Sequence, residues 1–179
     1  NKTFGEFVPR SGNASGGGQP GHACQCAPGG ANDYIYVIIQ PQVWAPLCKV
    51  MGRPELIEDP NFATPEARLK RLDEVWGVVE TWTRKHDKFK VMAMLNEIDV
   101  PCGPIMSTKD LYTDESLRAQ KMIVDIKHPT RGSYATVGCP LRLSDTDIDY
   151  GPAPLLGEHN EEVLKMLGYS KDQVEKLKA

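Results

Sequence analysis

A run of glycines near the start of the chain constrains its local structure more than any other feature. Residues 15–21 read Ser-Gly-Gly-Gly-Gln-Pro-Gly. Glycine loses more conformational freedom on folding than any other residue and has no side chain to fill a core, so this run is not predicted to form core, helix or strand. It predicts either a mobile linker or a backbone that approaches a ligand closely, with the Gln19 amide at its edge.

The composition is ordinary for a soluble globular protein and argues against a nucleic-acid partner. Of the 179 residues, 40% are hydrophobic and 25% are charged, and the formal net charge is −3. A phosphate backbone requires clustered Lys and Arg, but the densest basic cluster, at residues 84–90, is interrupted by Asp87 and is predicted to be a solvated helix end. No apolar run reaches the roughly 20 residues that span a bilayer, and the polar N-terminus does not resemble a signal peptide, so no membrane partner is expected.

The cysteines predict reduced thiols in a cytoplasmic protein, because their number is odd and their spacing irregular. They are Cys24, Cys26, Cys48, Cys102 and Cys139. The segment His22-Ala-Cys-Gln-Cys26 resembles half of a metal site, but strand alternation places its histidine and cysteines on one face. No second pair of ligands is spaced to complete a tetrahedral zinc site, so no metal is predicted.

Hydrophobic patterns predict strands and helices in the first part of the chain. Residues 34–39 form a β-branched and aromatic run typical of a buried strand, and another short strand is predicted around residues 22–27. Apolar residues then recur at helical spacing. The helices predicted from this spacing cover residues 42–51, 65–85 and 88–98.

Local signals support these helices. Thr64, which is followed by a proline, and Asp87 are residue types that cap helix N-termini. Leu69 and Leu72 lie on the predicted apolar face of the 65–85 helix. The tryptophans fall on apolar helix faces and are predicted to be core residues: Trp44, Trp76 and Trp82.

The second part of the chain is predicted to contain shorter elements. Residues 144–156 are acidic and then proline-rich, which predicts an extended connector. The predicted elements are a helix at 107–112, strands at 122–126, 134–137 and 141–143, and amphipathic helices at 157–167 and 170–177.

These elements predict an α/β fold class, with a small α+β domain of short, mostly antiparallel strands and flanking helices and a C-terminal helical arm. Residues 1–33 are expected to form the glycine-rich loop and its lead-in. Residues 34–143 are expected to form the small α/β domain. Residues 144–179 are expected to form the connector and the helical arm that docks elsewhere.

Three segments together resemble the class III CoA-transferases, and most closely those of the formyl-CoA/oxalate type. The segments occur in the order and at the spacing typical of that family. They are Gly12-Asn-Ala-Ser-Gly-Gly-Gly-Gln-Pro-Gly21, Ile98-Asp-Val-Pro-Cys-Gly-Pro-Ile-Met-Ser107 followed by Lys109-Asp-Leu111, and Ala153-Pro-Leu-Leu-Gly-Glu-His-Asn-Glu-Glu-Val-Leu164.

The resemblance implies an enzyme that converts formyl-CoA and oxalate into formate and oxalyl-CoA. An aspartate attacks the acyl-CoA thioester to give a mixed anhydride, the CoA thiolate returns to form an aspartyl-CoA thioester, and the acceptor acid displaces it through a second anhydride. These intermediates hydrolyse readily, so a covering flap makes physical sense. The residues carried over are Gly16, Gly17 and Gly18 as the flap and Gln19 beside it.

The resemblance also implies the partners. The coenzyme A thioester is a substrate, the acceptor is a small oxalate-like acid, no tightly bound cofactor is involved, and the family forms an interlocked homodimer. The catalytic aspartate and most CoA contacts belong to the family's N-terminal half, which nothing in this chain matches. The chain is therefore expected to be a C-terminal portion that is inactive alone and whose arm returns to the absent half.

Two positions depart from the family pattern, and they leave alternatives for the substrate and for the function. Ser15 stands where a fourth glycine is usual, and His22 stands where a large apolar residue is common. The acceptor can therefore differ, for example succinate or a carnitine-type acyl carrier, while the racemase branch of the family is less favoured. The alternative of another class is a non-catalytic acyl-CoA or protein interaction module derived from the same domain.

Two residues outside the glycine run have the chemistry of catalysts but are interpreted as structural. Cys102 lies in Val100-Pro-Cys-Gly-Pro-Ile105, and the sequence places no His or acid to activate its thiol, so a rigid buried crossing between helix and strand is expected. His159 falls at the first turn of a predicted helix, where a structural hydrogen bond between the arm and the large domain is expected.

Overall fold

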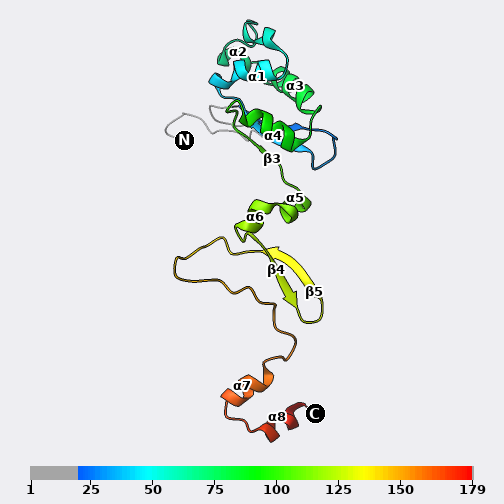
Figure 1. Cartoon of the computed structure of the whole chain (residues 1–179), viewed down its shortest axis with the longest axis vertical. Helices are drawn as coiled ribbons and strands as arrows, with labels where there is room; N and C mark the ends of the chain where they lie inside the picture. Colours follow the sequence, from blue (N-terminus) through cyan, green and yellow to red (C-terminus); the bar gives the residue numbers. More distant parts are fainter. Residues whose placement is uncertain (1–19, 179) are drawn as a thin grey trace, which may run out of the picture. The chain divides into compact units, whose positions relative to one another are not determined.

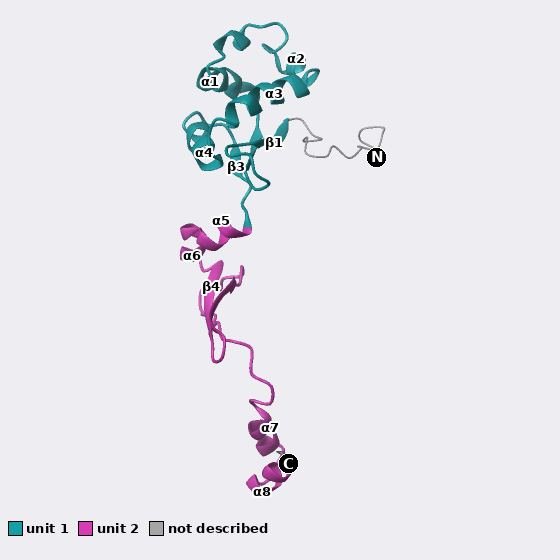
Figure 2. Ribbon diagram, turned by 90° about the vertical axis from the view of Figure 1, so that its right-hand side faces the viewer, with its two compact units in different colours: residues 1–107 teal, residues 108–179 magenta. Residues whose placement is uncertain are grey.

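The computed structural model describes residues 20–178 of the chain, which divides into two compact units (Figure 1 and Figure 2). Unit 1 ends at Ser107 and unit 2 begins at Thr108. This boundary falls inside the range 34–143 for which one domain is predicted, and the predicted domain ranges stay predictions. No helix among the described residues is long and apolar enough to cross a membrane.

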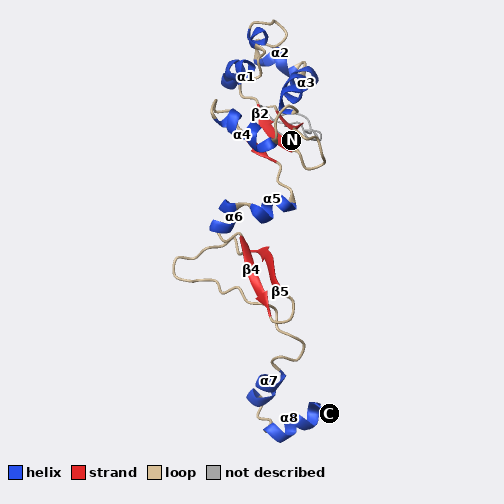
Figure 3. Cartoon of the chain, turned by 45° about the vertical axis from the view of Figure 1, so that its right-hand side comes forward, coloured by secondary structure: helices blue, strands red, loops and turns tan. Residues whose placement is uncertain are grey.

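Unit 1 combines a three-stranded antiparallel sheet with helices (Figure 3). The strand order is β1-β2-β3, so β2 lies in the middle. The mixture of helices and short antiparallel strands confirms the predicted fold class. The elements are β1 (Gly21–Gln25), β2 (Tyr34–Ile38), α1 (Trp44–Val50), α2 (Pro65–Leu69), α3 (Leu72–Thr83), α4 (Lys88–Asn96) and β3 (Cys102–Pro104), with 3-10 turns at Pro41–Val43 and Pro54–Ile57.

One face of the sheet carries the core of unit 1. Cys24 of β1 and Ile35 and Val37 of β2 are fully buried, because alternate strand residues point to the same side. Helices α1, α3 and α4 add their apolar sides to this cluster, including Leu47 and Val79. The three tryptophans are buried in it, which confirms their prediction as core residues.

Both predicted N-caps are confirmed. Thr64 Oγ1 accepts a hydrogen bond of 3.2 Å from the Ala67 amide. Asp87 Oδ1 accepts from the amides of Phe89 and Lys90 at 2.9 and 3.0 Å. These caps satisfy amides that the first helical turn leaves without partners.

The single helix predicted over residues 65–85 is wrong, since α2 ends at Leu69 and α3 begins at Leu72. Arg68 lies next to the break. It is buried, its guanidinium lies 4.8 Å from the centroid of the Trp44 ring, and its Nη1 donates to the carbonyls of Phe62 and Ala63. A straight helix places Leu69 on the apolar face, but this side chain is 50% exposed.

The sequence predicted that the basic cluster at residues 84–90 is solvated, and this is wrong for one of its members. Lys88 is only 5% exposed. Its Nζ donates to the carbonyls of Asn32 at 3.0 Å and Ile105 at 2.9 Å, so it joins the β1–β2 loop to the end of β3. The acceptors are distant in sequence, and no local pattern pointed to them.

Unit 2 contains a two-stranded antiparallel hairpin and four short helices among its described residues. The strands and the last two helices were predicted within a few residues, but the strand at 141–143 is wrong, because only an isolated bridge joins Leu143 to Thr146. Helix α6 was not predicted. The elements are α5 (Thr108–Thr113), α6 (Glu115–Ala119), β4 (Ile123–His128), β5 (Gly132–Val137), α7 (Asn160–Met166) and α8 (Lys171–Lys178).

A close backbone approach ends the unit 2 hairpin. The Gly138 amide donates to the Met122 carbonyl at 2.8 Å. A Cβ at Gly138 would lie 1.9 Å from the carbonyl oxygen of Lys121, so only glycine fits without a backbone shift. The next amide, that of Cys139, donates to Tyr150 Oη at 3.0 Å, which ties the chain after the hairpin back to it.

Candidate functional site

The four predicted site residues, Gly16, Gly17, Gly18 and Gln19, lie outside the described residues. The described structure begins directly after them, at Pro20. The Pro20 carbonyl accepts a hydrogen bond of 3.0 Å from the Ile39 amide, and β1 starts at the next residue. The C-terminal end of the glycine segment is therefore joined to the edge strand of the unit 1 sheet.

An aromatic ring lies across the first residue of β1. Tyr36 pairs with Ala23 in the antiparallel register, and Gly21 pairs with Ile38, so both residues face the same side of the sheet. A Cβ at Gly21 would lie 2.5 Å from Tyr36 Oη and 2.9 Å from Cε1 and Cζ of the ring. A side chain at position 21 would therefore require the Tyr36 ring to shift. No sequence pattern marks this contact, because it depends on the register of β1 and β2.

The opposite side of β1 faces α3. The imidazole of His22 stacks on the indole of Trp76, with ring centroids 5.2 Å apart and an interplanar angle of 23°. Trp76 Nε1 is buried and has no hydrogen-bond partner among the described residues. One of the two positions at which the sequence departs from the family pattern, His22, therefore packs on a core tryptophan.

The thiols of unit 1 are held in their protonated form. Burial is the main cause that raises the pKa of Cys24 to about 12, and the nearby Glu80 carboxylate adds to it. Burial likewise raises the pKa of Cys26 to about 11 and that of Cys48 to about 11. A thiol that stays protonated at neutral pH is a poor nucleophile.

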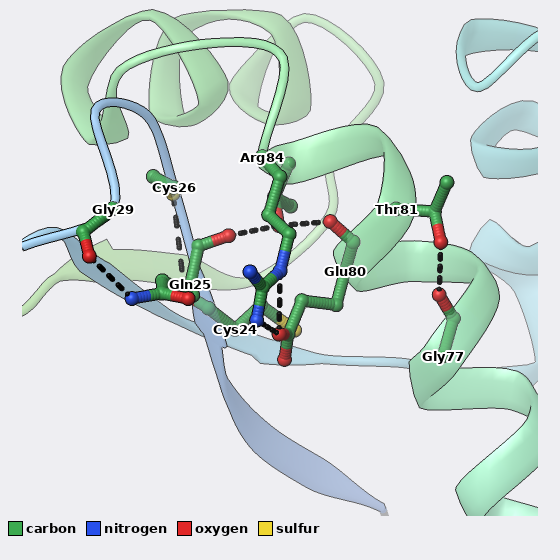
Figure 4. A network of polar contacts seen from close by, with 9 residues as sticks. Cys24, Gln25, Cys26, Gly29, Gly77, Glu80, Thr81 and Arg84 are labelled. Carbon is green, nitrogen blue, oxygen red and sulfur yellow. Dashed lines mark hydrogen bonds and ion pairs between the residues drawn. The ribbon is translucent and has the colours of Figure 1, made fainter.

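Figure 4 shows the polar contacts of β1 and α3 around Cys24 and Cys26. Cys26 Sγ lies 3.9 Å from the Cys24 carbonyl, and Thr83 Oγ1 donates to the Gln25 carbonyl at 2.7 Å. The Glu80 carboxylate accepts from Arg84 Nε at 2.8 Å on the same helix. Of these contacts, the Thr83 bond joins the helix to the strand, and the other two lie within one segment each. The described residues include no group of three or more His, Cys, Asp or Glu that could hold a metal.

Cys102 and His159, the two other residues weighed as catalysts, have ordinary structural surroundings. Burial raises the pKa of Cys102, whose Sγ lies 3.7 Å from Asn96 Oδ1. His159 Nδ1 lies 3.5 Å from a Glu162 carboxylate oxygen on the exposed side of α7. The predicted hydrogen bond of His159 to another domain stays a prediction.

Aspartates of both units serve in caps, turns and ion pairs. Besides the cap at Asp87, Asp33 accepts from the Gly30 amide at 2.7 Å, and Asp59 accepts from the Asn61 amide at 2.8 Å. Asp114 accepts from the Leu117 amide, which lowers the pKa of its carboxyl group. Asp125 pairs with Arg118 at 2.9 Å. These carboxylates therefore have local structural roles.

Curated relatives match the whole chain. A formyl-CoA:oxalate CoA-transferase of Streptomyces coelicolor is 53% identical over 180 residues, which cover 100% of this chain and 44% of that protein. A protein of the same name from Bradyrhizobium sp. (strain ORS 278) is 51% identical over 174 residues, which cover 96% of this chain and 41% of that protein. The chain thus spans less than half the length of the curated relatives it matches.

Solved structures share the fold. A CaiB/BaiF family protein from Brucella suis superposes with a TM-score of 0.72 at 25% identity, over 87% of this chain and 38% of that one. Rv3272 from Mycobacterium tuberculosis superposes with a TM-score of 0.59 at 21% identity, over 78% of this chain and 38% of that one. The family model described as "CoA-transferase family III" matches residues 1–160 of the sequence. The chain therefore belongs to CoA-transferase family III.

Proposed function

We propose that this chain is the C-terminal part of an enzyme that transfers CoA from formyl-CoA to oxalate. The observation that carries the proposal is the 53% identity, over the full chain, to a relative named for that reaction. The relatives extend well beyond the matched region, so the activity is assigned to the chain together with an N-terminal portion like theirs. The chain alone is expected to be inactive.

Residues 16–19 are proposed to cover the acyl intermediates. Backbone amides free of side chains can approach a reacting carbonyl and exclude water from it. Gln19 adds an amide at the edge of that cover. The support is the family resemblance of the glycine-rich segment, residues 12–21.

The nucleophile is proposed to be an aspartate of the N-terminal portion. Its carboxylate attacks the thioester carbonyl, and CoA leaves as the thiolate to give an aspartyl formyl anhydride. The thiolate then attacks the aspartyl carbonyl, which releases formate and forms an aspartyl-CoA thioester. Oxalate displaces the CoA thiolate to give a second anhydride, and attack of the thiolate on the oxalyl carbonyl yields oxalyl-CoA and regenerates the aspartate. Two observations support this choice. The buried thiols of unit 1 stay protonated, and the aspartates described above are engaged in caps, turns and ion pairs.

The coenzyme A thioester is proposed as a substrate, with no tightly bound cofactor, and the enzyme as a cytoplasmic homodimer. The homodimer is supported by the family resemblance of the sequence. The five free cysteines support a reducing compartment.

A complementation experiment tests the proposal. The chain is mixed with formyl-CoA and oxalate, alone and with the separately produced N-terminal portion of the Streptomyces coelicolor relative, and oxalyl-CoA is measured. Oxalyl-CoA in the mixture but not with either part alone is expected. Tight acyl-CoA binding by the chain alone, without transfer in the mixture, would instead support a non-catalytic module.

The role of the glycine segment has its own test. In the complete enzyme, Gly17→Ala is expected to lower kcat more than it raises the KM for formyl-CoA, because the segment acts on the reacting carbonyl and not on CoA. Steady-state kinetics that show only a higher KM would overturn this role.

A further inference from the structure

The loop that follows the unit 2 hairpin is closed at two points. At its base, the Cys139 amide donates a hydrogen bond of 3.0 Å to Tyr150 Oη, and near its tip an isolated bridge joins Leu143 to Thr146. The loop lies between β5 and α7 in Figure 1. Compact loops whose ends are held together often carry functional residues. This loop and the end of α6 line a cavity of about 180 Å³ within unit 2.

The charged residues that line this cavity are mainly cationic. Lys121 lies at the end of α6, Arg142 lies in the loop, and Asp147 is the one carboxylate among the described lining residues. Neither cation forms an ion pair with another residue in the described part of the chain. Leu143 and Ile148 add apolar wall. The lining therefore has a net positive charge and N–H donors that no carboxylate of the described residues neutralises.

The backbone at Lys121 has a conformation that favours glycine. Its φ is 53°, which lies in the left-handed region. Its amide donates to the Arg118 carbonyl at 2.9 Å, and the Met122 amide donates to the Leu117 carbonyl at 2.8 Å. These two bonds are the usual pattern where a helix ends on a left-handed residue, and glycine is the common residue there because a Cβ is strained in that conformation.

Other helix ends of the chain show the residues that suit this position. Gly52 after α1 and Gly168 after α7 make the same pair of bonds, with φ of 72° and 86°. Asp99 after α4, with φ of 56°, is of a type that adopts the left-handed region more readily than most. Lysine has no such advantage, so Lys121 does not serve the helix end. What it adds over glycine is an ammonium group at the cavity, and strain kept in this way is a reason to look for a function.

We propose that this cavity binds a small oxyanion, a carboxylate or a phosphate, between Lys121 and Arg142. Both side chains donate charge-assisted hydrogen bonds, and the guanidinium fork fits two oxygens of one such group. Pockets for drug-sized ligands measure about 300–1,000 Å³. A cavity of about 180 Å³ therefore limits the ligand to a small anion. The inference does not rest on the transfer reaction.

Titration of the whole chain provides the first test. Oxalate and inorganic phosphate are the two probes, potassium chloride at equal ionic strength is the reference, and amide NMR shifts of residues 119–150 are measured. Saturable binding of at least one probe is expected, with a Kd of about 1 mM or tighter, because two charge-assisted bonds reach that affinity. The tighter probe shows whether the ligand is a carboxylate or a phosphate. Shifts that do not saturate, or that chloride reproduces, overturn the inference.

Substitutions test whether the two cations hold the anion. Lys121→Gln and Arg142→Gln are each expected to weaken binding by at least about 10-fold, because each removes a charged donor. Lys127→Gln and Arg131→Gln are matched controls, since they remove the same charges at exposed positions of unit 2 outside the cavity lining. They are expected to change the affinity by less than about 2-fold, because solvent screens such charges. Equal losses in all four variants mean that only net charge matters, and they overturn the site.

Lys121→Gly separates binding from folding. Glycine adopts the left-handed conformation without strain, so the amide signals of unit 2 are expected to persist to the same or a higher urea concentration than in the parent chain. The same variant is expected to bind the anion at least about 10-fold more weakly. A lower urea midpoint with intact binding gives Lys121 a structural role and overturns the inference.

Asp147→Asn tests the sign of the ligand charge. Its carboxylate lines the cavity and repels an anion, so the substitution is expected to tighten binding of the preferred probe by about 2-fold to 5-fold. Weaker binding in Asp147→Asn means that the carboxylate contacts a cationic group of the ligand, and it overturns the assignment to an oxyanion.

Discussion

The two units of this chain differ in what their apolar side chains contact. In unit 1, helices cover one face of a sheet, and this unit holds all the buried hydrophobic residues of the described chain except Ile126 and Val174. In unit 2, Leu143 is 70% exposed and Leu156 is fully exposed. Amphipathic periodicity is present in both units, so it identifies a helix but not whether its apolar face has a partner within the same unit. The burial of apolar side chains therefore distinguishes unit 1, which has a core of its own, from unit 2.

A core truncation in each unit gives the largest expected contrast. Leu47→Ala in unit 1 is expected to lower the free energy of unfolding by about 2–5 kcal/mol, because Leu47 is fully buried and leaves a cavity. Leu143→Ala in unit 2 is expected to stay within about 0.5 kcal/mol, as for other exposed sites. Urea unfolding followed by far-UV circular dichroism measures both, and similar losses in the two variants would remove the distinction between the units.

Lys88 tests whether buried polar contacts also support unit 1. Lys88→Met removes a charged donor from two carbonyls and is expected to lower the free energy of unfolding by about 1–3 kcal/mol. Lys90→Met, two residues away and exposed, is the control and is expected to have little effect. Tryptophan fluorescence measures the unfolding of unit 1 alone, since all three tryptophans lie in that unit. Equal effects of the two substitutions would contradict the role of Lys88 in joining the β1–β2 loop to β3.

The buried thiols predict an alkaline weakness confined to unit 1. Folding raises the pKa of Cys24 to about 12 and those of Cys26 and Cys48 to about 11, so above pH 9 the unfolded chain loses these protons first. Stability is therefore complete below about pH 9 and declines as pH rises towards the folded-state values, by about 1.4 kcal/mol per pH unit for each thiol. Fluorescence-detected unfolding between pH 8 and 11 measures the slope, and Cys24→Ala is expected to make it shallower. An unchanged slope in that variant would argue against the linkage.

Helix caps give the smallest contrast. Thr64→Ala in unit 1 is expected to lower the free energy of unfolding by about 1 kcal/mol, because the Ala67 amide loses its acceptor. In unit 2, Ser170→Ala removes a longer contact of 3.4 Å to the Gln173 amide, and α8 is expected to fray without altering the unfolding of unit 1. Fluorescence-detected unfolding of both variants checks the pair. A larger loss from Ser170→Ala would mean that α8 supports unit 1.

Local chemistry accounts for what was predictable from the sequence. Strand β2 was predicted because its residues are β-branched or aromatic, and the caps at Thr64 and Asp87 were predicted because a cap and its amides lie within three residues. The break after Leu69 was missed because the apolar spacing continues across it, from Leu69 to Leu72. The role of Lys88 was missed because its acceptors lie 56 and 17 residues away.

The candidate site likewise has one part that could be predicted from the sequence and one part that could not. Residues 16–19 were singled out from sequence and resemblance, and they stay a prediction. The contact of Tyr36 with Gly21 depends on the register of two strands, which no sequence pattern around either residue specifies. Pairing register is a property of the folded sheet, so a contact that depends on it is found only in a structure.

The close approach at the end of the unit 2 hairpin has a consequence for sequence divergence. Because the obstacle at Gly138 is the backbone oxygen of Lys121, no change of a neighbouring side chain relieves it. If another residue replaces Gly138, no single substitution elsewhere can relieve its clash with this oxygen. Gly151, in contrast, has open space around its side-chain position. Sequence divergence within unit 2 is expected to be uneven, with tolerance at position 151 and near-absence of change at position 138.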